Sequence, residues 1–306
     1  DSADTAATRG QVVVPLRADG SREPVFCVHP ADGLAWLFAG LTPYLDDRPV
    51  FGLQDPFVVA GDTAATSIRE LAARYVAEIR AIVPQGPYHL VGWSLGGLIA
   101  QEMAAELRSQ GAEVGFLGLL DSYPATGGEL ETDGELETDG APARAEASAE
   151  DARATVADLL GGWRAVIDID AVTAPDDPAA MAAAVRERVV GLGLLDGAAF
   201  DRMLQRMATS ARRAVDHRPR TYDGDAMLVV AAAGEADPDT TAGRWTPFLG
   251  GRVTRVDVDA DHLKDQVADL AAFHHGRHVA VARGQHAADR VAVALEPELA
   301  AESAAH

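Results

Sequence analysis

The 306-residue sequence has little cysteine, lysine or asparagine: Cys27 and Lys264 each occur once, and asparagine does not occur. One cysteine cannot form an internal disulfide, which excludes a disulfide-stapled fold. Cys27 stands in an apolar run, so we expect a buried structural thiol. Positive charge is also scarce: the chain has 26 Lys and Arg but 47 Asp and Glu, which gives a net charge of −21. This balance argues against nucleic acids and anionic membranes as partners.

Long apolar runs are missing as well, because no stretch approaches the roughly 20 residues of a membrane span. The chain begins at Asp1 rather than Met, and its first residues do not resemble a secretory signal. Residues 1–11 are small and polar, and we interpret them as a linker within a longer cytoplasmic protein. A hydrophobic fraction of 48% still permits a sizeable core.

Short apolar runs alternate with helical patterns through the first 124 residues. Ser67 and Glu70 form a capping-box pattern, and an apolar face with helical spacing runs from Ile68 to Ile82. The alternation predicts an α/β fold with a mainly parallel sheet covered by helices on both faces. We predict strands at 12–16, 24–28, 49–53, 88–93, 114–120, 226–231 and 252–258, with the first two paired, and helices at 68–82 and 95–110.

The pattern breaks after Pro124. The sequence Gly-Glu-Leu-Glu-Thr-Asp occurs at 128–133 and again at 134–139, and the acidic segment 126–150 is expected to be mobile. An Ala-rich helical region follows. We therefore interpret residues 12–124 and 217–283 as the core, 125–216 as a helical insertion and 284–306 as a tail.

The candidate nucleophile lies in Gly92-Trp93-Ser94-Leu95-Gly96, which is a G-x-S-x-G motif between a predicted strand and a predicted helix. The tight turn needs residues without bulk two positions before and two positions after Ser94, and Gly92, Gly96 and Gly97 meet that need. It would hold the Ser94 hydroxyl above the sheet edge, where the backbone N–H of Leu95 and the helix dipole can stabilise an oxyanion.

A serine hydroxyl needs a base to accept its proton, and His262 is the favoured candidate because it follows the last predicted strand. His217 and His89 are expected to be structural. We also predict a final helix that starts near Leu263, and we expect the histidines that fall on it or after it to be solvated: His274, His275, His278 and His286.

The acid that orients the histidine has two possible positions. Asp121 ends the strand 116–120, while Asp237, or nearby Glu235, follows the strand 226–231. Both positions lie at the carboxyl edge of the sheet. We favour Asp121, because four apolar residues precede it and a buried carboxylate needs a partner.

These residues resemble a known family. The stretches Phe26-Cys27-Val28-His29-Pro30-Ala31-Asp32-Gly33, Gly92-Trp93-Ser94-Leu95-Gly96-Gly97 and Leu119-Leu120-Asp121-Ser122-Tyr123-Pro124 are similar to type I thioesterase domains of nonribosomal peptide and polyketide synthetases. The position of His262 is similar too. The resemblance extends from about Val12 to Ala280, apart from most of the insertion.

The resemblance implies an α/β-hydrolase fold in which the insertion is a mobile lid. It implies Ser94 as nucleophile, His262 as base and Asp121 as orienting acid, with Ala31 giving a second oxyanion N–H beside Leu95. It also implies a partner, an upstream carrier protein whose phosphopantetheine arm presents the thioester. No cofactor or metal is expected on this domain itself, and we expect it to be monomeric.

The predicted lid carries apolar residues that either pack among lid helices or line the substrate: Leu159, Leu160, Trp163, Leu192 and Leu195. In the second case they suit a long peptide or depsipeptide, released as a macrocycle, with or without prior oligomerisation, or by hydrolysis. Alternatives are a stand-alone editing thioesterase or esterase, and a catalytically silent binding module. For carrier docking we expect an arginine-bearing face around Arg69, Arg74 and Arg80.

Overall fold

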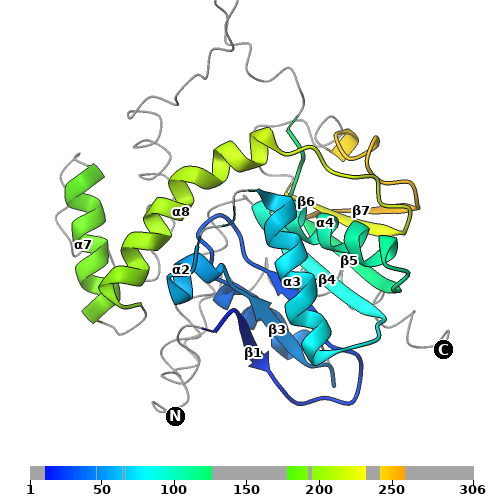
Figure 1. Ribbon diagram of the computed structural model, residues 1–306, viewed down its shortest axis with the longest axis horizontal. Coiled ribbons are helices and arrows are strands. Elements are labelled where there is room, and N and C mark those ends of the chain that lie inside the picture. Colours follow the sequence, from blue (N-terminus) through cyan, green and yellow to red (C-terminus); the bar gives the residue numbers. More distant parts are fainter. Residues whose placement is uncertain are drawn as a thin grey trace, which may run out of the picture.

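The computed structural model describes residues 11–45, 47–63, 65, 67–125, 178–191, 195–231 and 242–258. They form a seven-stranded sheet with helices on both faces (Figure 1). This arrangement confirms the predicted α/β class. The segment 126–150, the tail 284–306 and most of the predicted lid lie outside the described residues.

The sheet has the strand order β1-β3-β2-β4-β5-β6-β7. Only β1 and β3 are antiparallel, and all other neighbours are parallel. The carboxyl ends of β2, β4, β5 and β6 therefore meet at one edge, where sites form in sheets of this kind. The strands are β1 (Val13–Arg17), β2 (Val25–Val28), β3 (Val50–Leu53), β4 (Tyr88–Trp93), β5 (Val114–Leu120), β6 (Ala226–Ala231) and β7 (Val253–Val258).

Each face of the sheet has its own core, because alternate residues of a strand point to opposite faces. In β4, all of whose residues are buried, Leu90 packs with α3 (Ile68–Ile82) and α4 (Leu95–Ser109). Its neighbour Val91 packs on the other face with the 3₁₀ helix η1 (Trp36–Tyr44). Burial on both faces explains why the central strands are continuously apolar.

Helix α3 begins where its capping residues predict. The Ser67 hydroxyl oxygen accepts a hydrogen bond from the Glu70 N–H at 3.1 Å. The apolar face that follows is buried through Ile79. Ile82 is an exception, since it is 41% exposed at the last turn.

The predicted pairing of the first two strands is wrong, because β3 lies between β1 and β2. The segment joining them does not close a hairpin. Instead, the N–H groups of Ser21 and Arg22 both donate to the carbonyl of Asp47, in the loop before β3. Those bonds direct β2 to the far side of β3, where the two strands pair in parallel.

Two helices between β2 and α3 were not predicted: η1 and the five-residue α2 (Pro56–Ala60). For α2 the sequence did carry a signal. Asp55 caps its first turn, proline stands at its start, and Gly61 ends it with a left-handed φ of 72°. No comparable start or stop signal marks η1.

The region predicted to be helical contains α7 (Pro178–Gly191) and α8 (Gly197–Asp216). Helix α8 is capped by Asp196, which accepts a hydrogen bond from the Ala199 N–H at 2.7 Å. It packs against α2 and reaches α4, so part of the predicted insertion contacts the core (Figure 1). None of the described helices is long and apolar enough to cross a membrane.

Candidate active site

Ser94 occupies the sharp turn between β4 and α4. Its φ of 53° and ψ of −122° place a non-glycine residue in a region that L-amino acids rarely adopt. Its N–H donates to the carbonyl of Leu120 at 2.9 Å, which ties the turn to the end of β5. The G-x-S-x-G motif therefore has the strand–turn–helix setting it requires.

The glycines of the motif are needed because the turn is crowded. A Cβ built on Gly92 would overlap the carbonyl oxygen of Gly96, and a Cβ on Gly96 would overlap that of Val28. A Cβ on Gly97 would overlap the hydroxyl oxygen of Ser122. The first turn of α4 thus lies closer to β4, to the turn after β2 and to the turn after β5 than side chains at these three positions would allow.

The Ser94 side chain is half-buried and makes no capping hydrogen bond to the helix that it precedes. The N–H groups of the first turn of α4, that of Leu95 among them, lie at the positive end of the helix dipole. The hydroxyl therefore lies at the position in the fold where a developing negative charge is best stabilised.

The turn after β2 carries Ala31 and borders the serine turn at Gly96. Its Pro30 carbonyl accepts hydrogen bonds from the Gly33 N–H at 3.2 Å and from the ring Nδ1 of His29 at 2.5 Å. His29 is fully buried, and that burial lowers its pKa, although the charge of Asp55 opposes the change. A neutral His29 with its proton on Nδ1 fits this contact, because a carbonyl can only accept.

Asp121 follows β5 beside the serine turn and also has a left-handed φ, of 42°. Its carboxylate Oδ1 accepts a hydrogen bond from the Tyr123 hydroxyl at 2.8 Å and one from the Ala231 N–H at 3.3 Å. Its own N–H donates to the carbonyl of Val229 at 2.7 Å. The carboxylate is thus held between the ends of β5 and β6.

Several predicted site residues lie outside the described part of the chain. They are the base His262, the alternative acids Asp237 and Glu235, and the predicted lid residues Leu159, Leu160, Trp163 and Leu192. Leu195 is described and lies half-buried just before α8. The structure thus places Ser94 and Leu95 at one turn, Asp121 in the turn after β5 to which the Ser94 N–H is bonded, and Ala31 in the turn that borders Gly96. The catalytic roles of these residues, and the choice of base, stay predictions.

The sequence model of the family described as "Thioesterase domain" matches residues 23–275. The chain belongs to this thioesterase family. A "Dimodular nonribosomal peptide synthase" of Bacillus subtilis (strain 168) is 32% identical over 259 residues. The match covers 82% of this chain but 10% of the relative, so the chain spans about a tenth of the length of that protein.

Solved thioesterase domains share the fold. The NocB thioesterase domain, in covalent complex with a fluorophosphonate nocardicin G analogue, superposes with a TM-score of 0.56 at 25% identity, covering 92% of this chain and 99% of that one. The Vlm2 thioesterase domain bound with a dodecadepsipeptide gives 0.58 at 20% identity, covering 88% and 96%. The thioesterase domain described here therefore has the α/β-hydrolase fold.

Sequence reasoning missed the contacts that hold the thioesterase acid loop. Tyr123 was quoted in the motif but given no role, yet it donates to Asp121. Burial and the neighbouring Asp121 charge raise the pKa of Tyr123, so its hydroxyl stays protonated as a donor. The buried Trp245 donates from Nε1 to the carbonyl of Ser122 at 2.5 Å. The spacing of Asp and Tyr in the motif was the one available signal.

Three further predictions concern buried residues away from the reacting groups. Cys27 is fully buried in β2, and burial raises the pKa of its thiol, which makes it an inert core residue as expected. His89 is buried in β4. His217 is buried with its Nε2 at 3.5 Å from Glu102, and burial lowers the pKa of His217.

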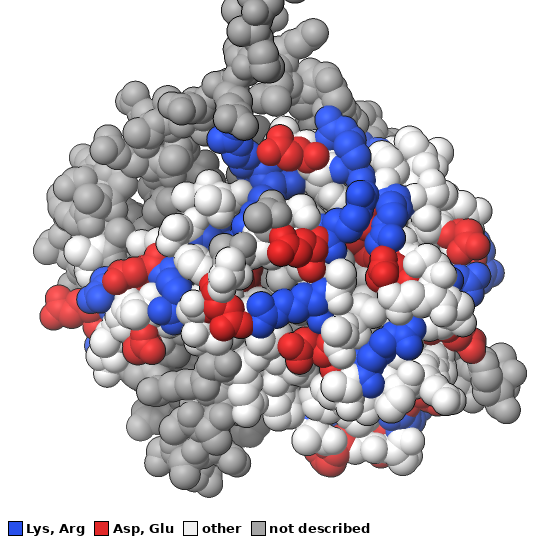
Figure 2. Space-filling view, in the orientation of Figure 1, with Lys and Arg blue, Asp and Glu red and all other residues white. Residues whose placement is uncertain are grey.

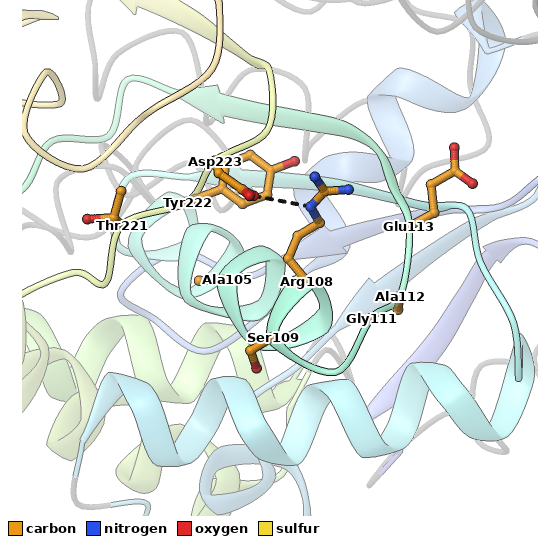
Figure 3. A pocket seen from close by; sticks show the side chains of 9 residues that line it. All are labelled: Ala105, Arg108, Ser109, Gly111, Ala112, Glu113, Thr221, Tyr222 and Asp223. Atoms are coloured by element: carbon orange, nitrogen blue, oxygen red, sulfur yellow. Dashed lines mark hydrogen bonds and ion pairs between the residues drawn. The ribbon is translucent and has the colours of Figure 1, made fainter.

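A hollow of about 630 Å³ lies at the other end of α4 from Ser94 (Figure 3). Its lining includes Arg108 and Asp223, which form an ion pair of 3.2 Å across it. A 15-residue helix is about 22 Å long, and Ser94 precedes its first residue. This hollow is therefore separate from the thioesterase site.

Proposed function

We propose that this thioesterase domain accepts a peptidyl or depsipeptidyl chain from the phosphopantetheine arm of an upstream carrier protein and releases it from the synthetase. The observation that carries the proposal is the strained turn at Ser94. The Ser94 hydroxyl lies at the N-terminus of α4 and makes no capping hydrogen bond to that helix. Asp121 is fixed at the end of the neighbouring strand. A backbone this strained persists only where the surrounding structure holds it, typically at active sites.

In the first half-reaction, His262 accepts the proton of Ser94 as its Oγ forms a bond to the thioester carbonyl carbon. The carbonyl oxygen becomes an oxyanion, to which the N–H groups of Leu95 and Ala31 donate. The carbon–sulfur bond then breaks, and His262 returns the proton to the departing phosphopantetheine thiolate. Asp121 orients the imidazole and stabilises its charged form, which leaves an acyl ester on Ser94.

In the second half-reaction, His262 takes a proton from an acceptor as it bonds to the acyl carbon, and the ester bond to Ser94 breaks as His262 returns the proton to the Ser94 Oγ. If water attacks, the product is a linear acid, and if an amine or hydroxyl of the same chain attacks, the product is a macrocycle. We favour the macrocycle, formed with or without prior oligomerisation of shorter chains. The predicted apolar lid residues Leu159, Leu160, Trp163, Leu192 and Leu195 would exclude water. The dodecadepsipeptide bound by the related Vlm2 domain supports a substrate of this class.

The carrier partner is proposed to dock on the face that bears Arg69 and Arg74. The Arg69 side chain is 55% exposed, and Arg74 pairs with Asp62 at 2.5 Å. Figure 2 shows that basic and acidic side chains alternate on this side of the molecule. Arg80, the third expected member, instead lies over the ring of Tyr88 at 5.9 Å. Arg74 is half-buried and Arg69 also lies 3.6 Å from the buried Glu102, so the surface suits a partner of mixed charge whose carboxylates reach the exposed side of Arg69.

The nucleophile is tested by labelling with a fluorophosphonate, which adds its mass to an activated serine. We expect one adduct on the wild-type chain and none on Ser94→Ala. Ser109→Ala, at the far end of the same helix, is the matched control and should label as wild type. No adduct on the folded wild type would overturn the proposal and favour a silent binding module.

Release is tested by incubating the domain with a panel of peptidyl and depsipeptidyl thioesters and analysing the products by mass. We expect cyclic products from chains that carry an internal amine or hydroxyl. Linear acid from every thioester would contradict macrocyclisation while leaving the serine thioesterase intact.

A further inference from the structure

Helix α8 lies in the region predicted to be a lid, and Figure 1 shows it running from α7 past α2. Three of its residues, four positions apart and so on one face, contact the core. Arg202 donates to the carbonyl of Val58 at 2.9 Å. Arg206 and Ser210 lie one and two turns further along, towards the turn that carries Ala31. This face of α8 is therefore attached to the core along three successive turns.

The central contact is a fully buried ion pair. Arg206 and Asp55 have side chains 2% and 1% exposed, with Nη2 to Oδ1 at 2.9 Å and Nε to Oδ2 at 2.5 Å. Asp55 also caps α2, and its N–H donates to the carbonyl of Gly33 at 2.8 Å, within the turn after β2. The pair thus links α8 to the turn through one residue, and removal of either partner would leave the other as a buried unpaired charge.

The last contact reaches the turn directly. The hydroxyl of Ser210, which is 1% exposed, lies 3.0 Å from the carbonyl oxygen of Ala31. It also lies 2.9 Å from the carbonyl of Arg206 in its own helix, so its single proton is shared between two acceptors. The Ala31 carbonyl therefore has a donor that comes from 179 residues further along the chain.

The two peptide planes on either side of the Ala31 Cα are both held. In a trans peptide the N–H points opposite to the C=O, so bonds to the Pro30 carbonyl also set the direction of the Ala31 N–H. Ser210 restrains the following peptide through the Ala31 carbonyl. Without that restraint the peptide after Ala31 could rotate, which would loosen the turn that the Gly33 N–H closes on the Pro30 carbonyl and so release the Ala31 N–H.

We infer that Ser210 of α8 is a positioning residue, which holds the Ala31 N–H in the orientation needed to stabilise the oxyanion. The inference rests on the proposed function. It makes α8 a fixed support of the active site rather than a freely moving part of a lid. Loss of an oxyanion donor costs roughly 100- to 1,000-fold in kcat, and loosening one costs less.

The test compares Ser210→Ala with Thr209→Ala in the whole domain. Thr209 is the matched control, because its hydroxyl bonds the same Arg206 carbonyl within the helix but contacts nothing in the turn. We expect Ser210→Ala to lower kcat for a peptidyl thioester about 10-fold with KM unchanged, and to slow fluorophosphonate labelling of Ser94 equally. Thr209→Ala should match wild type, and Ser210→Thr, which keeps the hydroxyl, should recover most of the rate.

If Ser210 had a purely structural role, Ser210→Ala would instead lower the melting temperature in proportion to the activity. Ser210→Thr would then not restore the activity. Equal kinetics in Ser210→Ala and Thr209→Ala, with Ser94 still required for labelling, would overturn the inference alone. Labelling that persists after Ser94→Ala would overturn the proposed function itself, so the two failures are distinguishable.

Discussion

At the scale of residues, backbone strain gathers at the candidate site. Among the described residues three non-glycines have a left-handed φ, and two of them are Ser94 and Asp121. Such conformations cost on the order of 1–3 kcal/mol each and persist where neighbouring structure imposes them. Here the neighbours are the carbonyl of Leu120, which binds the Ser94 N–H, and that of Val229, which binds the Asp121 N–H.

Asp32, next to Ala31, provides a prediction about pH. Burial raises the pKa of Asp32 to about 7, although a hydrogen bond from the Leu34 N–H opposes the shift. Between about pH 4 and pH 7 the folded protein keeps this proton while the unfolded chain loses it. Stability should therefore fall as the pH rises through this window and level off above it.

The prediction is checked with Asp32→Asn, which keeps the oxygen that accepts from Leu34. We expect the variant to gain stability over wild type as the pH rises from 4 to 7, by on the order of 1 kcal/mol or roughly 2–4 °C in melting temperature. Asp19→Asn, an exposed carboxyl, serves as control and should follow the wild-type curve. Parallel curves for Asp32→Asn and wild type would contradict the raised pKa.

At the scale of elements, α8 was predicted as part of a lid, and the structure shows it attached to the core. The Ala-rich pattern correctly predicted a helix in this region. The same pattern gave no sign that Arg206 would be buried against Asp55, 151 residues earlier, or lie over the ring of Phe57. Charged residues are almost never fully buried unless paired, so neither residue alone could reveal the contact.

Removing Arg206 should destabilise the domain strongly, because Asp55 would remain as a buried unpaired charge. For Arg206→Met we expect a loss of about 3–5 kcal/mol in the free energy of unfolding, measured by urea denaturation. Arg186→Met is the matched control, since Arg186 pairs with Asp201 between side chains 44% and 59% exposed. Its replacement should leave the free energy of unfolding close to that of the wild type, because water screens an exposed pair. Similar losses for both variants would show that the buried pair does not secure α8.

At the scale of the whole molecule, buried charges connect parts that are distant in sequence. Glu102 of α4 is fully buried, and its carboxylate accepts from the N–H of Arg220 at 2.9 Å and from its Nε at 2.8 Å. Arg69 and His217 lie within 3.6 Å of the same carboxylate. One acidic side chain thus joins α3 and α4 to the end of α8 and the segment leading into β6.

Glu102→Gln should therefore lower the stability of the whole domain rather than that of a single helix. We expect a loss of about 2–3 kcal/mol in the free energy of unfolding, since the charge that Arg220 and Arg69 face is removed. Asp225→Asn removes one partner of an ion pair whose side chains are 75% and 58% exposed, and should cost no more than about 1 kcal/mol. A cost for Glu102→Gln as small as for Asp225→Asn would refute the linking role.

Local features of the site were predictable, and contacts between distant segments were not. Ser94 and its glycines form one contiguous motif, and β4 and β5 begin and end where their apolar runs do. The pairing of β1 with β3 was missed because a strand's composition does not say which neighbour it bonds. Tyr123 was missed as the donor to Asp121 because a hydroxyl two residues away has many possible partners.

The sequence by itself determined the strand–turn–helix around Ser94, because only glycine fits at Gly92 and Gly96 and because steric limits act over a few residues. It also indicated the family, because the motifs around His29, Ser94 and Asp121 are short and each forms a single turn. The tertiary structure alone decided which turns meet: β3 between β1 and β2, Asp121 against β6, and Ser210 on the Ala31 carbonyl. These contacts join residues up to 179 positions apart, and they depend on packing of the complete core rather than on any local pattern.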